Sequence, residues 1–226
     1  TVYCPDYQTV IISNPAFTGS EGDWILKLSY LNFYPGNSYN LHSVFFSYDA
    51  FMPALHGGAG IFLTNDYLGG IVNDMRGGFT YSYHLQTGKR IYINGGLAAS
   101  FYHRGYNFGS AVLPDQIDSY GNVTLPAGEA LGKEGRTVFD IGTGFLLMTN
   151  RFFAAVSINH LAAPDLESSG AMDSQLKRKY QVNLAGEFPA GKQGKIAIRP
   201  VVFFEKQGNY TSLGSGGILE NKLLSF

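Results

Sequence analysis

The sequence contains a single cysteine and few charged residues. One cysteine cannot form a disulfide within the chain, so no internal cross-link stabilises the fold. Charged residues make up 15 % of the 226 residues, well below the usual quarter, and the net charge is only −1. A chain with this balance lacks the basic surface that attracts phosphate backbones, and we expect no nucleic-acid partner.

Long hydrophobic runs are also missing. No stretch of about 18 or more uncharged apolar residues occurs, so the sequence contains no candidate transmembrane helix. No signal peptide is visible, and for an exported protein the chain would start after cleavage. Cys4 follows the bulky Tyr3, where lipidation requires a small residue, and we interpret Cys4 as a free thiol near a flexible end.

Glycine and aromatic residues, in contrast, are abundant. The chain has 29 Gly, 17 Phe and 15 Tyr against one Trp. This balance is typical of membrane-spanning strands with aromatic girdles. A mean hydropathy near zero is compatible with such strands, because side chains that face the interior of a barrel are polar and dilute the average.

The most informative stretch is FDIGTGFLLMTNRFFAAVSINHLAAPD at residues 139–165. In its first half Phe139, Ile141 and Phe145 alternate with the small or polar Asp140 and Gly144. The second half alternates in the same way, after a short turn at residues 148–151. Successive side chains of a strand point to opposite faces, so this stretch predicts a hairpin with one apolar and one polar face.

The same alternation recurs along most of the chain and predicts ten strands of about nine to twelve residues, long enough to cross a bilayer at the tilt of a barrel. Their connections alternate in length. The expected long loops are 34–39, 67–74, 104–136 and 162–176, and the expected short turns are 51–56, 87–90, 148–151 and 189–194. A soluble β-sandwich would also alternate, but the repeated aromatics and the loop lengths favour an all-β, antiparallel transmembrane β-barrel of the outer membrane. Short turns on the periplasmic side place the N-terminus in the periplasm.

The polar phase of each strand predicts which side chains point into the barrel. A charged side chain that faces lipid at mid-membrane costs about 2–4 kcal/mol, so charge is expected inside. The expected interior residues are Lys27, Asp49, His84, Asp140, Asn159, Asn183, Glu187 and Arg199, with the pairing among the charges left open. The expected lipid-facing residues include Leu26, Phe46, Tyr81, Val156, Leu184 and Ile198. Pro200 lies on the lipid-facing phase and removes a backbone donor, which predicts a bulge or bend there.

The two ends of the chain differ from the middle. Residues 1–22 are expected to form a periplasmic N-terminal segment, and 23–226 the barrel. Residues 211–217 predict a tenth strand, and Leu223–Phe226 the opening of another. A barrel that stopped there would leave an open strand edge in lipid, so we expect further hairpins after Phe226.

Three segments outside the strands are candidates for partner binding. The motif Asn14-Pro15-Ala16-Phe17-Thr18-Gly19 combines a fixed φ at Pro15 with a turn at Gly19, and either anchors the N-terminal segment at the base of the barrel or binds a partner. Loops as long as 104–136 and 162–176 are commonly functional. The candidate partner-binding residues are Asn14, Pro15, Phe17, Gly19, Asp115, Asp118, Tyr120 and Asp165.

Little in the sequence points to catalysis. Ser157, His160 and Asp140 could be read as a hydrolytic triad, but three such residue types occur in any chain of this size. The favoured interpretation of His160 is a hydrogen-bonded structural residue at the rim. The histidines lack metal-ligand spacing, and Gly57-Gly58-Ala59-Gly60 lacks the Lys and Ser or Thr of a phosphate-binding loop. We interpret these glycines as allowing the barrel to bend or another backbone to approach closely. We therefore expect no catalytic residue, metal or cofactor.

Residues 139–165 closely resemble the central signature of the PorP/SprF family of Bacteroidetes outer-membrane proteins. Further stretches resemble the family in the same order, namely SNPAFTG at 13–19, FFSYDAFM at 45–52, GGAGIFLTND at 57–66 and FTYSYHLQ at 79–86. Residues 1–12 depart from the usual opening of the family, and the family continues with further strands past Phe226.

The resemblance implies a non-enzymatic outer-membrane barrel that serves type IX secretion, in gliding motility or surface display. It also implies partners: periplasmic ring lipoproteins, a peptidoglycan-binding lipoprotein and large adhesins as cargo, besides the lipid of the outer membrane. The alternative is a diffusion porin or small-molecule transporter, which would need a wider open channel than about ten strands provide.

Overall fold

The computed structural model describes residues 10–36, 41–107, 116–118, 122–123, 133–166, 175–190, 196–221 and 224–225. It is an all-β structure in which twelve strands form one antiparallel sheet. The strands are β1 (Ile25–Asn32), β2 (Leu41–Met52), β3 (Gly57–Leu68), β4 (Val72–Gly88), β5 (Ile91–Asn107), β6 (Lys133–Thr149), β7 (Phe152–Asn159), β8 (Lys179–Gly186), β9 (Phe188–Ala190), β10 (Ile196–Gln207), β11 (Tyr210–Asn221) and β12 (Leu224–Ser225). No helix in these residues is long and apolar enough to cross a membrane.

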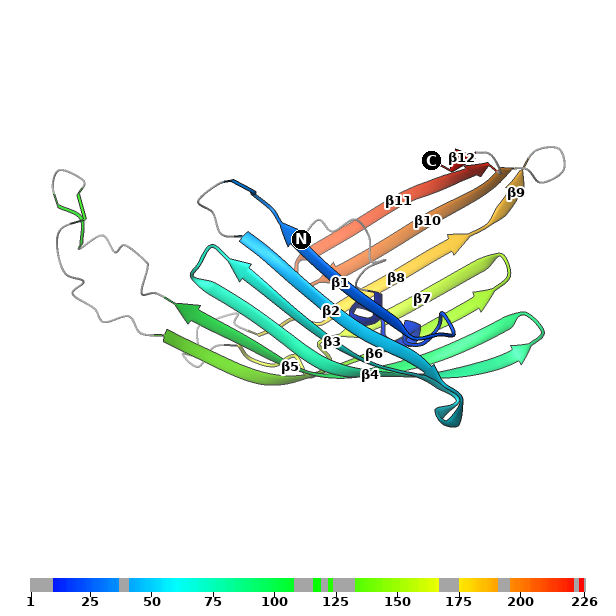
Figure 1. The fold of residues 1–226 in the computed structure, drawn as a ribbon, viewed down its shortest axis with the longest axis horizontal. Coiled ribbons are helices and arrows are strands. Elements are labelled where there is room, and N and C mark those ends of the chain that lie inside the picture. Colours follow the sequence, from blue (N-terminus) through cyan, green and yellow to red (C-terminus); the bar gives the residue numbers. More distant parts are fainter. Residues whose placement is uncertain are drawn as a thin grey trace.

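Strands that follow one another in the chain are also neighbours in the sheet. The order runs from β1 to β8 and on through β10, β11 and β12, with β9 paired to β10. The sheet curves strongly, and Figure 1 shows the N-terminal elements on its concave side. Among the described strands, β1 and β12 are the two ends of the order, so the sheet does not close on itself.

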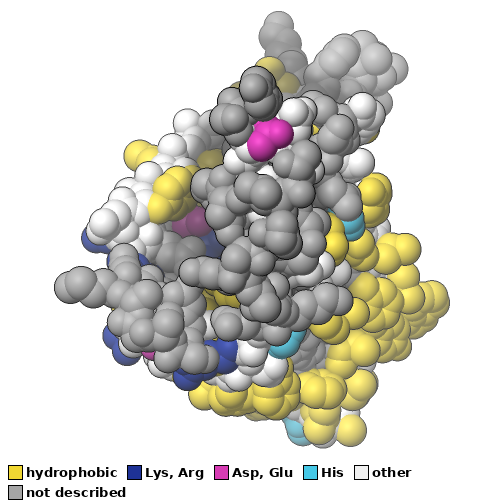
Figure 2. Space-filling view, turned by 90° about the vertical axis from the view of Figure 1, so that its left-hand side faces the viewer, with side chains coloured by type: hydrophobic (Ala, Val, Ile, Leu, Met, Phe, Trp, Pro, Cys, Tyr) yellow, Lys and Arg dark blue, Asp and Glu magenta, His cyan; other side chains and the backbone are white. Residues whose placement is uncertain are grey.

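The two faces of the sheet have opposite character, as the period-two pattern predicts. Outward side chains are large and apolar, and many are well exposed, such as Leu28, Phe79, Leu97 and Phe145. Seen from one end of the strands, hydrophobic side chains gather along the outer surface at the lower right (Figure 2). An exposed apolar surface of this extent needs a lipid environment, because water would make it a site of aggregation.

The connections divide into two ends, which we call the turn end and the loop end. The turn end carries β2–β3, β4–β5 and β6–β7, where residues 89–90 and 150–151 make two of the turns. At the β2–β3 connection the short helix η2 (Pro53–Leu55) is followed by His56 in the left-handed region. The loop end, on the left of Figure 1, carries residues 33–40, 69–71, 108–132, 160–178 and 208–209.

Three expectations for the strands need correction. The expected loop 67–74 is wrong, because β3 and β4 extend until only Gly69, Gly70 and Ile71 join them, with both glycines at positive φ. Strands β4, β5 and β6 each have 17 residues, so they are longer than expected and shorten the expected loop 104–136 to 108–132. They exceed the roughly 9–11 residues that a tilted strand needs to cross a bilayer.

The pairing shows no bulge at Pro200, where a bulge or bend was expected, but it is interrupted on one side of the strand. Toward β11 the pairing of β10 runs without a shift through Pro200 and Gly217. Toward the other side, β10 pairs β8 up to Val201 and β9 from Ile198, so Pro200 falls where β8 ends and β9 begins. Proline has no N–H to donate, which explains why a single expected strand is divided here into β8 and β9.

Candidate functional site inside the curved sheet

The N-terminal segment Val10–Gly19 lies across the inner face of the sheet. It begins with the short helix α1 (Val10–Ser13) and continues into the 3₁₀ helix η1 (Pro15–Phe17). Asn14 joins them in an extended conformation, as expected before proline, and its side-chain oxygen accepts a hydrogen bond from Ala16 N at 2.9 Å. The proline therefore sets the direction in which the segment crosses the strands.

The segment follows one row of residues that are paired in register from strand to strand. This row consists of Gly58, Ser82, Gly96, Gly144 and Ser157, on β3 to β7, and we call it the glycine lane. Because paired residues share a face of the sheet, all five positions point to the same side.

The missing side chains of the lane make room for a second backbone. A Cβ at Gly58 would collide with the carbonyl of Thr18, and one at Gly96 with the backbone of Pro15 and Ala16. Glycine in a strand commonly marks such a close approach.

Polar side chains beside the glycines bind the main chain of the segment. They donate hydrogen bonds to the carbonyl groups of Ser13, Ala16 and Thr18. Asp49 instead accepts one from the N–H of Gly19. The bonds are Ser82 Oγ to Ala16 O (3.0 Å), Asn94 Nδ2 to Ala16 O (3.3 Å), His84 Nε2 to Thr18 O (3.0 Å), Ser157 Oγ to Ser13 O (2.7 Å), Asn159 Nδ2 to Ser13 O (2.8 Å), and Gly19 N to Asp49 Oδ2 (2.8 Å). The backbone of the segment has no ladder of its own, so these bonds satisfy groups that would otherwise be buried without partners.

Two apolar clusters fix the ends of the segment. At one end Ile11 is buried against Phe45 and Phe62. At the other end Ala16 packs with the buried Leu146, and Phe17 meets Phe153 edge to face with ring centroids 6.2 Å apart. Burial of apolar surface at both ends stabilises the segment on the sheet.

Asn14 is the buried polar anchor of the segment. Only 2 % of its surface is exposed, and its Nδ2 donates to the carbonyls of Val156 (3.2 Å) and Phe145 (3.4 Å). Pro15 and Gly19 are buried as well, and Phe17 is half-buried. Of the two interpretations of this motif, the burial of these residues supports anchoring, because they offer a partner little accessible surface.

Two of the other candidate partner-binding residues, Asp118 and Asp165, lie at the loop end. Asp118 is half-buried and accepts a hydrogen bond from Asn122 N at 2.8 Å, beside a bridge between Ile117 and Val123. Asp165 is exposed and bridges Gln175. Asp115 and Tyr120 lie outside the described residues.

Where the residues expected in the interior lie in paired strands, the pairing places them on the same face of the sheet as the N-terminal segment. Asp49, Asp140 and Asn159 are buried, and Lys27, His84, Asn183 and Arg199 are half-buried. Glu187 is exposed between β8 and β9. Lys27 pairs with Glu21 (3.6 Å) and Arg199 with Glu187 (3.0 Å), which answers the open question of their partners.

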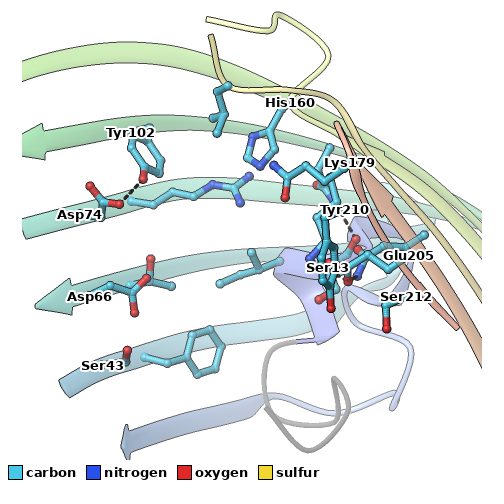
Figure 3. A pocket seen from close by; sticks show the side chains of 18 of the residues that line it. Ser13, Ser43, Asp66, Asp74, Tyr102, His160, Lys179, Glu205, Tyr210 and Ser212 are labelled. Carbon is cyan, nitrogen blue, oxygen red and sulfur yellow. Dashed lines mark hydrogen bonds and ion pairs between the residues drawn. The ribbon is translucent and has the colours of Figure 1, made fainter. Parts of the chain in front are cut away.

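A cavity of about 690 Å³ lies on the loop-end side of the segment (Figure 3). Its lining combines Ile12 and Ser13 of the segment with side chains from strands near both ends of the sheet, among them Phe45 of β2 and Tyr210 of β11. The two ends of the sheet therefore face each other across this cavity. Its walls carry several charged groups, including Asp66, Lys179 and Glu205.

The charges of the cavity are mostly paired. Arg104 binds Asp74 through two nitrogens, each at 2.7 Å, and Tyr102 donates its hydroxyl to the same carboxylate at 2.6 Å. Lys179 lies 3.0 Å from Glu205. Bidentate Arg–carboxylate pairs hold fixed geometry, so this wall of the cavity is rigid rather than adaptable.

A second charged group surrounds Asp140, which is fully buried. His160 Nδ1 lies 2.7 Å from Asp140 Oδ2, and Arg76 Nη2 lies 3.6 Å from the same oxygen. Ser157 does not complete a triad with this pair: its hydroxyl donates to Ser13 O, and no hydrogen bond among the described residues joins it to His160. The arrangement matches a structural role for His160 at the end of β7.

The described residues contain no group of three or more His, Cys, Asp or Glu side chains that could hold a metal ion. What sequence reasoning missed is the glycine lane. Of the two interpretations of the stretch around Gly58, bending or a close backbone approach, the structure shows a close approach, and Gly58, Gly96 and Gly144 each make room for the N-terminal segment. The available signal was their recurrence on the polar phase of three strands, which a segment crossing those strands requires.

Taken together, an apolar outer face, a polar inner face and neighbouring antiparallel strands define an outer-membrane protein of the β-barrel type. The family model described as "Type IX secretion system membrane protein PorP/SprF" matches residues 7–222, and the chain belongs to this family. It is thus a membrane component of the type IX secretion system. No curated protein and no solved structure matches the chain.

Proposed function

We propose that this protein is a non-enzymatic outer-membrane component that links the periplasmic machinery of type IX secretion to the export or surface anchoring of large adhesins, in gliding or surface display. Its N-terminus and turn end face the periplasm in this proposal, and its loop end faces the cell surface. The periplasmic partners are ring lipoproteins and a peptidoglycan-binding lipoprotein.

The observation that supports a role through contacts is the position of the N-terminal segment. It crosses five strands, from β3 to β7, and occupies the inner face toward the turn end. Its polar neighbours are engaged in holding it, as with Ser82 and Asn94 on Ala16. When the inner face is occupied in this way, contacts with partners fall to the surfaces at the two ends of the sheet.

Those surfaces differ at the two ends. The turn end presents Lys89, Arg90 and Arg151, all exposed, in two short turns that the sheet holds in one region. The loop end carries the connections 108–132 and 160–178, which are long enough to shape a specific contact. In this proposal the first set contacts the machinery and the second contacts cargo.

A diffusion porin is the second candidate, and the cavity of about 690 Å³ is the observation in its favour. Conductance of single molecules in planar bilayers separates the two. A secretion component with a filled interior is expected to give no stable open channel, whereas a porin conducts without any partner.

Site-specific photo-crosslinking in living cells tests the proposed role. A photoreactive residue at Lys89 or Arg151 should capture periplasmic secretion components, and one at Asp165 should capture an exported adhesin. Leu97, which is exposed on the apolar outer face, is the matched control and should capture neither. Capture of adhesin from the turn end and of periplasmic proteins from the loop end would reverse the orientation and contradict the proposal.

A further inference from the structure

We propose that the glycine lane is a polypeptide-binding site, which residues 10–19 occupy as a ligand from the same chain and which a separate peptide of the same sequence pattern can occupy in their place. This goes beyond the proposed role in secretion, because it assigns a ligand class to the interior of the sheet. The lane would bind a short segment in which an amide side chain is followed, three residues later, by an aromatic side chain.

The first argument is that the sheet recognises the backbone of the segment. Six hydrogen bonds from the inner face end on main-chain atoms, at Ser13 O, Ala16 O, Thr18 O and Gly19 N. The glycines of the lane act in the same way, since they admit a main chain at distances that a Cβ would forbid. Main-chain contacts give affinity, and side-chain pockets give specificity.

Two pockets supply that specificity. The amide of Asn14 fits over Gly144 and donates to the carbonyls of Phe145 and Val156. Three residues further along, Phe17 packs against the cluster of Ala16, Leu146 and Ala155 and meets Phe153 edge to face. A peptide therefore needs an amide and an aromatic group at this spacing to match the segment.

The second argument is that the segment leaves two hydrogen-bond acceptors of the inner face without a partner. Asn94 and Asn159 are buried to 98 % or more, yet the Oδ1 atom of each has no hydrogen-bond partner among the described residues. Both amides already donate to the segment through Nδ2. The segment therefore leaves acceptor capacity on the inner face unsatisfied, in the case of Asn159 beside Gly142.

The third argument is that the segment can leave without disturbing the sheet. Every strand from β1 to β11 pairs with its neighbours, and the segment contributes to none of these ladders. It is joined to β1 through Ser20–Trp24, where Glu21, Gly22 and Asp23 are exposed. On its loop-end side it borders the cavity through Ile12 and Ser13, so open space lies directly beside it.

A cleavable linker tests the proposal with the full chain. Residues 20–23 are replaced by a protease recognition sequence, the folded protein is purified and cut, and a fluorescent peptide of residues 10–19 (VIISNPAFTG) is added. We expect the cut protein to release its own segment and to bind the peptide, measured by anisotropy and mass spectrometry. The uncut protein should bind at least tenfold more weakly, because the tethered segment competes at high local concentration.

Three controls make the result specific to the lane. A peptide with Asn14→Ala and Phe17→Ala should bind at least tenfold more weakly than the native peptide. In the cut protein, Gly96→Ala should abolish binding, because its Cβ would collide with the backbone of Ala16. Gly95→Ala, on the opposite face and 3.7 Å from the ring of Phe145, should bind as the unmodified protein does.

Each other outcome overturns the proposal. If the segment is released and no peptide binds, the lane is not a peptide site. If the cut segment stays bound against a large excess of peptide, it is a permanent part of the fold. If Gly95→Ala and Gly96→Ala bind equally, the peptide binds elsewhere.

Discussion

The side-chain oxygen of Asn14 occupies the place where a Cβ at residue 144 would stand. The two residues are 130 positions apart in the chain, yet each is required by the other: the amide needs a position without a side chain, and Gly144 gains a packing partner. The same relationship recurs along the lane at Gly58 and Gly96. Close packing of a crossing segment thus explains glycines that a strand would otherwise disfavour.

This relationship predicts the effect of a single methyl group. Gly144→Ala should lower the free energy of unfolding by about 1–3 kcal/mol, the usual cost of overpacking, or expel the segment. Urea unfolding in detergent measures the first outcome, and limited proteolysis of the N-terminal segment measures the second. Gly95→Ala is the control and should change stability by less than about 0.5 kcal/mol. Equal effects of the two substitutions would mean that Asn14 does not occupy the lane.

The group around Asp140 predicts a larger effect. Asp140→Asn removes the charge that faces Arg76 and His160 and leaves the guanidinium buried, at a cost of about 3–5 kcal/mol. Glu187→Gln removes one partner of the exposed pair with Arg199 and should cost less than about 1 kcal/mol. Thermal unfolding of the reconstituted protein compares them. A smaller loss for Asp140→Asn than for Glu187→Gln would contradict the assigned burial.

The architecture follows from the sequence because strand periodicity is local. Leu26 and Lys27 fall on opposite faces of β1 as their alternation predicts, and the order of strands follows from short connections. Strand ends are less predictable. Asn73 and Asp74 are residue types typical of turns, yet they continue β4 because β3 and β5 supply partners on both sides.

The candidate site was predictable only in part. The sequence marks Asn14-Pro15 as a special backbone geometry, and the amide cap on Ala16 agrees with that. It does not reveal where the segment docks, because the row from Gly58 to Ser157 joins positions up to 99 residues apart through strand register. Register is a property of the whole sheet and is invisible in any one stretch.

Secretion should not depend on chemistry at Ser157 or His160. Ser157→Ala loses the hydrogen bonds to Ser13 O and Gln181 Oε1, each worth about 1 kcal/mol, and no reaction step. His160→Ala leaves Asp140 with Arg76 as its remaining ion partner. We expect export of cargo, normalised to the amount of assembled protein in the membrane, to stay within about twofold of wild type. A loss of a hundredfold or more at normal protein levels would favour an enzyme.

Neighbouring residues of β8 test the orientation of the two faces. With Cys4 replaced by Ser, Asn183→Cys should react with a water-soluble maleimide, because Asn183 lies on the inner face. Leu184→Cys, exposed on the apolar face, should react slowly in lipid and quickly in detergent. Labelling is followed by mass spectrometry. Equal labelling of both positions in lipid would contradict the assignment of the outer face to the membrane.

The long connection between β5 and β6 tests where specificity for cargo resides. Residues 116–123 include the bridge between Ile117 and Val123 and the hydrogen bond from Asn122 N to Asp118, so the two ends of this stretch lie together and it can be removed as a unit. The strands beneath pair continuously from Ile91 to Asn107, and their register does not depend on these residues. We therefore expect deletion of 116–123 to leave the amount of assembled protein unchanged and to reduce surface display of adhesin tenfold or more. Asn209→Ala, in the exposed turn at the same end of the sheet, is the control and should leave display unchanged. Full display after the deletion would exclude this connection as a contact for cargo and direct attention to residues 160–178.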